Sequence, residues 1–263
     1  MKGSVRCHLA CIAVLLCIIG CSEVNNIADS RDGSASASFE FEEDVTSQTR
    51  LRLMGVTGSV TITGSEEAST VQITGERIVE SKNDADATQH LEELEVRIEK
   101  SSGEISITTK QPQHSDNRNY RVDYTVILPN SFETHVTLVT GNVNINAMEN
   151  SVSINNVTGF VSLSEFIGNA FITSVTGNID VSATLPEDGT FHLNTVTGGI
   201  RIDVPRTTSA QFTAGVVTGG ITVSGIEYDV IEDDPMGMRA TLGDGGGEIR
   251  ANVVTGHVIL KGH

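Results

Sequence analysis

Three stretches near the middle of this 263-residue chain share one pattern: VTLVTGNVNI at 136–145, INNVTGFVSL at 154–163 and ITSVTGNIDV at 172–181. The tripeptide Val-Thr-Gly occurs seven times, and from Gly141 to Gly219 its copies are spaced by 18, 18, 21 and 21 residues. Self-similarity at a nearly fixed period is the signature of a repeat protein. The seven glycines are Gly58, Gly141, Gly159, Gly177, Gly198, Gly219 and Gly256.

Apolar residues recur at fixed offsets from these glycines. Val or Ile stands two residues after each glycine, and Val, Ile or Leu stands four residues after it. This period of two indicates a strand with one buried face. Every copy also has Val two residues before the glycine and an apolar residue five before it. The three-residue step between those two positions breaks the alternation, so we expect the chain to turn a corner there.

Each unit therefore reads as strand, corner, Val-Thr-Gly turn, strand and variable loop. A unit of about 20 residues cannot bury its apolar stripe alone, but stacked units can. The sequence predicts an all-β protein, a parallel β-solenoid whose Val, Ile and Leu columns form one core while the Thr residues form a ladder along one edge. An up-and-down barrel or a sandwich is an alternative, since alternating strands at short intervals also describe those folds.

The repeat is lost between Gly64 and Asn130. Here the pattern predicts strands at 71–79, 94–100, 104–110 and 120–128, and one short helix over 84–93 that begins at Asn83 or Asp84. We expect residues 39–130 to form an N-terminal β-rich cap region and residues 131–263 to form the repeat solenoid.

The gap from Gly219 to Gly256 is long enough for a degenerate unit and a loop. Its most acidic part, EYDVIEDDPMGM at 227–238, is expected to project from the body. We expect His257 and His263, which follow the last turn, to lie on the terminal unit.

The N-terminus indicates export. Lys2 and Arg6 precede an uncharged apolar run over 9–19 that is too short to span a membrane. The order Ile18-Ile19-Gly20-Cys21 resembles the lipobox of bacterial lipoproteins. We expect residues 1–20 to be a removed signal peptide, Cys21 to carry the lipid (diacylglycerol and palmitate) that anchors the protein to a membrane, and residues 21–38 to be a flexible tether. An ordinary secretory signal is the alternative. All four cysteines lie within the first 21 residues, so no disulfide is expected in the mature domain.

The charge balance excludes one class of partner. The chain carries 17 basic and 34 acidic residues, a formal net charge of −17, and without the signal peptide 15 basic residues would remain, giving −19. Nucleic-acid binding needs clustered Lys and Arg, so no such partner is expected. The candidate partner contacts are the acidic residues of the projecting segment: Glu227, Asp229, Glu232, Asp233 and Asp234.

No constellation typical of catalysis stands out. In the outward column three residues after each glycine, Asp180 and Arg201 would be neighbours, which indicates a cross-strand ion pair more than a catalytic pair. The histidines are scattered without metal-site spacing, and the mature chain would have no Trp and three Tyr for stacking on sugars. We predict no catalytic residue, no cofactor and no metal ligand.

The Val-Thr-Gly copies, the strand YTVILP at 124–129 and the glycine-rich stretch at 243–247 resemble the bacterial "putative adhesin" repeat family, whose members include heads like those of autotransporter adhesins. The resemblance covers about 38–263. It implies a right-handed β-solenoid in the cell envelope, at the outer membrane or at the cell membrane of a single-membrane bacterium, with no established activity. We expect a non-enzymatic, lipid-anchored adhesin or surface-interaction scaffold with a cell-wall, glycan or protein partner. The alternatives are an envelope carbohydrate-active enzyme and an accessory component of envelope stress signalling.

Overall fold

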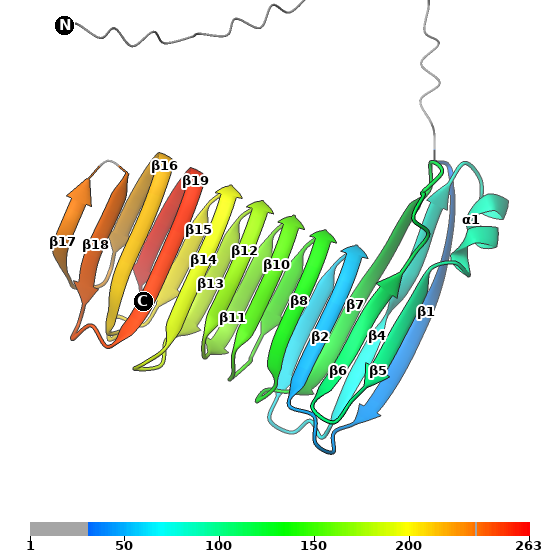
Figure 1. Cartoon of the computed structure of the whole chain (residues 1–263), viewed down its shortest axis with the longest axis horizontal. Helices are drawn as coiled ribbons and strands as arrows, with labels where there is room; N and C mark the ends of the chain where they lie inside the picture. The colour runs from blue at the N-terminus through cyan, green and yellow to red at the C-terminus, as the bar shows by residue number, and fades with distance from the viewer. Residues whose placement is uncertain (1–30, 235) are drawn as a thin grey trace, which may run out of the picture.

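The computed structural model describes residues 31–234 and 236–263. The expected signal peptide, Cys21 and the first part of the tether lie outside these residues. Within them the protein is almost entirely β, with nineteen strands in one continuous, mostly parallel sheet and one helix. The sheet does not close on itself (Figure 1). No helix in the described ranges is long and apolar enough to cross a membrane.

The N-terminal region contains the strands and the helix that its pattern predicts. All four expected strands are present with bounds shifted by at most two residues. The helix begins after Asn83, whose side chain accepts a hydrogen bond from the Asp86 amide at 2.9 Å. The elements are β1 Gly33–Asp44, β2 Arg50–Thr57, β3 Val60–Ser65, β4 Thr70–Ser81, α1 Asp84–Leu91, β5 Glu95–Lys100, β6 Glu104–Lys110 and β7 Asn119–Pro129.

The tether was expected to extend to residue 38, and this boundary is wrong. Strand β1 begins at Gly33 and pairs antiparallel with β4 from its first residue. Small residues such as Ala35 and Ala37 alternate here with serines, and they pack half-buried against the sheet. The stretch contains no large apolar residue, so its strand character depends on the pairing with β4.

The repeat region supplies two strands per unit. The elements are β8 Glu133–Thr140, β9 Val143–Asn146, β10 Val152–Thr158, β11 Val161–Ile167, β12 Ala170–Thr176, β13 Ile179–Thr184, β14 Thr190–Thr197, β15 Ile200–Val204, β16 Ala210–Ser224, β17 Tyr228–Asp234, β18 Gly237–Leu242 and β19 Gly247–Gly262. The strand before each glycine pairs in parallel with its counterparts, as Ile154 with Ile172, and so does the strand after it, as Val161 with Ile179. The predicted register is therefore confirmed.

Two rows of strands enclose a common core. The first row runs β5, β6, β2, β8, β10, β12, β14, β19, β16, β18, β17, and the second runs β1, β4, β7, β3, β9, β11, β13, β15, β19, β16. The long strands β16 and β19 belong to both rows. One apolar cluster extends from Leu51 to Leu260 and includes residues of the N-terminal region.

The Val of the tripeptide does not join this core, contrary to expectation. Six of the seven valines, at positions such as Val175 and Val217, are 44–60 % exposed, and the preceding residue is buried in their place. Buried and exposed side chains keep alternating up to the residue three before the glycine. The corner follows that residue. The buried residues at the corner are Leu138, Asn156, Ser174, Thr195, Val216 and Val253.

The glycines form a column at the corner. All seven have φ between +134° and +150°, a conformation that L-residues with a Cβ rarely adopt. A Cβ on Gly177 would overlap the carbonyl oxygen of Gly159, and one on Gly159 would overlap that of Gly141. The glycines are therefore required both by the turn and by the close stacking of successive corners.

The order of units along the row differs from their order in the sequence. Strand β19 lies between the β14/β15 unit and β16, so the last unit of the chain is internal. The chain leaves β16, forms the hairpin β17–β18, in which β18 pairs antiparallel with β16, and returns as β19, which pairs in parallel with β16. His257 consequently lies on an internal unit, which corrects the expectation that it would lie on the terminal one.

Candidate interaction surfaces

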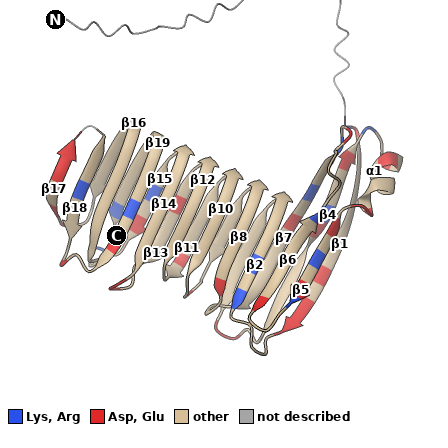
Figure 2. Cartoon of the chain, viewed as in Figure 1, with Lys and Arg blue, Asp and Glu red and all other residues tan. Residues whose placement is uncertain are grey.

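The acidic segment is an edge strand, not the projecting loop that its composition predicts. Asp229, Glu232, Asp233 and Asp234 lie in β17, and Glu227 immediately precedes it. Strand β17 pairs with β18 and, in the described part of the chain, with no other strand, so its outer edge is open. All seven of its residues are exposed. Figure 2 shows it as the strongly acidic end of the row.

Few of these carboxylates have a partner among the described residues. Arg239 lies 3.7 Å from Glu232, and Asp234 accepts a hydrogen bond from the Met236 amide at 2.8 Å. The described chain holds no group of three or more His, Cys, Asp or Glu side chains arranged for a metal ion. The hairpin therefore presents uncompensated negative charge rather than a chelating site.

A groove at the corner, next to this hairpin, was not predicted from the sequence. It has a volume of about 390 Å³, and its rims carry the exposed Val196, Val217 and Val254. Met236, from the turn of the hairpin, contributes to the lining, and its carbonyl accepts a 2.8 Å hydrogen bond from the Val216 amide. The repeated Val is the sequence signal for this groove, but its apolar character predicts a position in the core.

Asp180 and Arg201 lie on neighbouring strands as predicted, in register on β13 and β15. The expected ion pair between them is replaced by another: Arg201 Nε donates to Asp203 Oδ2 at 3.0 Å. Burial raises the pKa of the Asp180 carboxyl, an effect that Arg201 opposes and Asp203 reinforces. Asp180 and Arg201 line a depression of about 480 Å³ together with His257.

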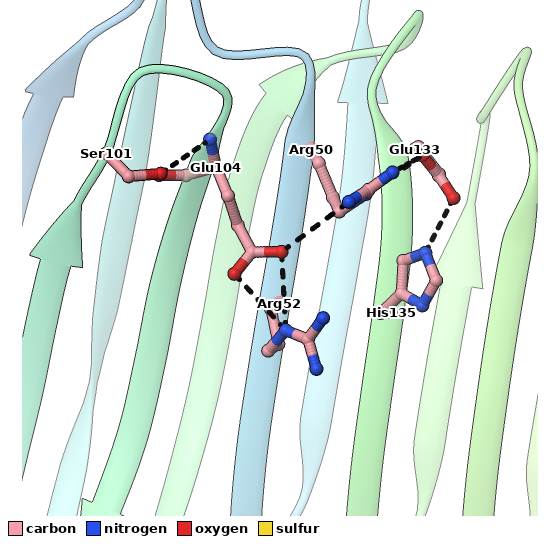
Figure 3. Close-up of polar contacts among 6 residues, drawn as sticks. All are labelled: Arg50, Arg52, Ser101, Glu104, Glu133 and His135. Atoms are coloured by element: carbon pink, nitrogen blue, oxygen red, sulfur yellow. Dashed lines mark hydrogen bonds and ion pairs between the residues drawn. The ribbon is translucent and has the colours of Figure 1, made fainter.

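A chain of ion pairs crosses strands β6, β2 and β8 on the outward side of the first row (Figure 3). Arg50 donates to Glu133 at 2.7 Å, and His135 contacts the other oxygen of Glu133 at 2.7 Å. Glu104 accepts a hydrogen bond from Arg52 at 3.2 Å. The hydrogen bond with His135, followed by those from Arg50, holds the pKa of Glu133 below its usual value despite partial burial. Because these groups satisfy one another on one sheet face, we interpret them as structural.

The remaining histidines do not assemble into a site in the described residues. His192 contacts Glu248 at 3.1 Å, which lowers the pKa of that carboxyl, and His90 contacts Glu93 at 3.0 Å. Each of these is a local pair. Cys21, the predicted lipidation site, lies outside the described residues.

No protein-family model and no curated protein matches the sequence. Among solved structures, a "putative cell adhesion protein" from Clostridium sporogenes is 15 % identical with a TM-score of 0.44, covering 86 % of this chain and all of its own. A "putative adhesin" from Bacteroides fragilis is 8 % identical with a TM-score of 0.35, covering 85 % and 97 %. One from Parabacteroides merdae is 11 % identical with a TM-score of 0.24, covering 87 % and 96 %. Sequence identities and TM-scores this low support no inference about activity or partners.

Proposed function

We propose that the protein is a non-enzymatic, lipid-anchored envelope protein of the adhesin type, which presents the acidic edge strand β17 to a basic macromolecular partner. In this proposal the two rows of strands coil as a right-handed β-solenoid that acts as a rigid spacer. The observation that carries it is the placement of the two ends: β1, which leads back towards Cys21, and β17 lie at opposite ends of the molecule (Figure 1).

The distance between the ends supports a spacer. Eleven strands lie side by side in the first row, from β5 to β17. At about 4.8 Å per strand this row spans roughly 48 Å. Only eleven residues lie between Cys21 and Gly33, where β1 begins. A lipid on Cys21 would hold the β1 end near the membrane and leave β17 facing away from it.

The charge of β17 determines what partner fits. Exposed, uncompensated carboxylates attract a basic surface and repel an acidic one, and this attraction is screened by salt. A second copy docking end to end is disfavoured, because the β1 end is acidic as well, with Glu40, Glu42 and Asp44 exposed. The partner is therefore a different macromolecule in the envelope or on another cell.

The alternative of a carbohydrate-active enzyme is not favoured by the geometry. Glycoside hydrolysis by the common route needs two carboxylates on opposite sides of the scissile bond. Among the described residues, Asp180 is the one carboxylate that lines the depression, and Asp203, which accepts a hydrogen bond from Arg201, is not part of the lining. We therefore assign no hydrolytic role to this face.

Fractionation of cells that express the Cys21→Ser variant tests the anchor. We expect the variant to leave the membrane fraction and to accumulate as an uncleaved precursor, whereas the wild-type chain stays with membranes after a high-salt wash. A variant that remains membrane-bound after that wash would show that no lipid on Cys21 is needed.

Capture of envelope material on immobilised protein tests the surface. The variant Asp229→Asn/Asp233→Asn removes two carboxylates without touching the bonds of Glu232 or Asp234. The control, Glu66→Gln/Glu67→Gln, makes the same charge change on an exposed turn of the N-terminal region. We expect the first variant to capture several-fold less basic protein, with the wild-type signal lost in 0.5 M salt and the control unchanged. Equal capture by both variants would remove β17 from the proposal.

A further inference from the structure

A depression on the outward side of the second row exists because one unit has a glycine where its neighbours have larger residues. The residues directly after the corner glycines point outward, and on three successive units they are Asn178, Gly199 and His257. Because Gly199 has no side chain, a hollow of about 480 Å³ remains between its two neighbours. Its lining comprises Asn178, Asp180, Gly198, Gly199, Ile200, Arg201, Gly256, His257 and Ile259.

The insertion of β19 decides which groups face this hollow. Ile200 pairs with Val258, so Gly199 lies opposite His257 on the adjacent strand. If the units followed the sequence order, Gly220 would occupy that place and two glycines would stand side by side. The tertiary structure instead brings an imidazole next to a carboxylate, a guanidinium and an amide from strands far apart in sequence.

Asp180 is the group in the hollow that lacks a partner. It is half-buried on β13, and no hydrogen bond or ion pair to it exists among the described residues. The neighbouring Arg201 is occupied by Asp203, so the three side chains carry a net charge of −1. A partly desolvated carboxylate without a donor is unfavourable, and a ligand that brings a cationic donor would relieve it.

The remaining groups offer hydrogen bonds to a polar ligand. The Oδ1 atom of Asn178 accepts from the Gly199 amide at 2.8 Å, which leaves its Nδ2 as a free donor. The imidazole of His257 is exposed, and Ile259 adds a half-buried apolar surface. The bare backbone of Gly198 and Gly199 forms part of the lining, where a ring can approach closely.

We propose that this depression binds an amino sugar, with its ammonium group on the Asp180 carboxylate and its hydroxyl groups on Asn178 and His257. The volume falls in the range of small-molecule sites. A neutral sugar would leave Asp180 without a cationic partner, and an anionic ligand would be repelled by Asp180 and Asp203. This site is independent of β17, so either proposal can fail without the other.

Titration of the purified full chain with glucosamine, followed by calorimetry or by ligand NMR, tests the site. Glucose and methylamine serve as comparators, because each carries one half of the proposed recognition. We expect glucosamine to bind at least tenfold more tightly than either comparator. Absence of glucosamine binding at tens of millimolar, or equal binding of methylamine, would overturn the proposal.

Two variants locate the binding. Asp180→Asn keeps the shape and removes the charge, and should weaken glucosamine binding at least tenfold. Gly199→Val fills the hollow; its Cβ would make only ordinary contacts, at 3.5 Å to the His257 carbonyl oxygen and 3.8 Å to Asn178 Oδ1, so the fold should persist. The control Gly103→Val makes the same change at a glycine where a Cβ would meet nothing within 4 Å and which lines no part of the hollow. Unchanged affinity in Asp180→Asn or Gly199→Val, or equal loss in Gly103→Val, would refute the assignment.

Discussion

Replacing Gly177 with alanine tests the reason for the glycine column. Gly177 has φ of +145°, and holding a residue with a Cβ in such a region costs about 1–3 kcal/mol. The added methyl group would also overlap the carbonyl oxygen of Gly159. No rotamer can move a Cβ away, so two adjacent corners must separate, and overpacking of this kind costs about 1–3 kcal/mol more.

Together these effects predict a loss of about 2–6 kcal/mol, which is a large share of the 5–15 kcal/mol typical of a domain. The measurement is urea unfolding of the purified chain followed by circular dichroism, with the free energy taken from the midpoint and slope. The matched control is Gly103→Ala, where a Cβ would meet nothing within 4 Å. A difference between the two variants below about 0.5 kcal/mol would refute the argument that stacked corners exclude a side chain.

Three further predictions concern stability. Ile179 is fully buried, so Ile179→Asp should unfold the domain in the same urea assay, whereas Asp180→Ser one residue on should cost little; similar tolerance of both changes would contradict the register. Asn83→Ala removes the helix cap and should cost about 1 kcal/mol, seen as a lower melting temperature than for an exposed helix substitution such as Thr88→Ala. The hydrogen bond with His135 holds the folded-state pKa of Glu133 below its unfolded value, so this stabilisation is fully present above about pH 4.5 and is lost as pH falls through the folded-state pKa; Glu133→Gln should lower the melting temperature at pH 7, and the difference from the wild-type chain should shrink as the pH is lowered below about 4.5.

Much of the local structure was predictable because its causes are local. Period-two alternation marks a strand wherever it occurs, and a Gly that recurs in register marks a corner that a Cβ would obstruct. The cap at Asn83 needs only a side-chain acceptor three residues before a free amide. These features depend on neighbours in the sequence, and the predicted strands, helix start and pairing register agree with the structure.

The candidate surfaces were predicted in part. The acidity of residues 227–234 is visible in the sequence, but their strand structure is not, because alternation is weak there and pairing with β18 supplies the order. The exposure of the tripeptide Val was also missed. The corner begins one residue later than expected, so the side chain of that Val points outward. Composition does not distinguish an inward from an outward Val at this place.

The sequence by itself determined that the chain is a repeat β protein with buried Val, Ile and Leu columns, glycine corners and an acidic surface. Only the tertiary structure decided which units are neighbours. All units share the same columns, so β19 matches the edge of β15 as well as β16 does, and no local pattern selects between them. The choice depends on the β17–β18 hairpin, which covers one edge of β16 and directs the chain back to the other. That long-range choice places His257 beside Gly199 and creates the hollow around Asp180.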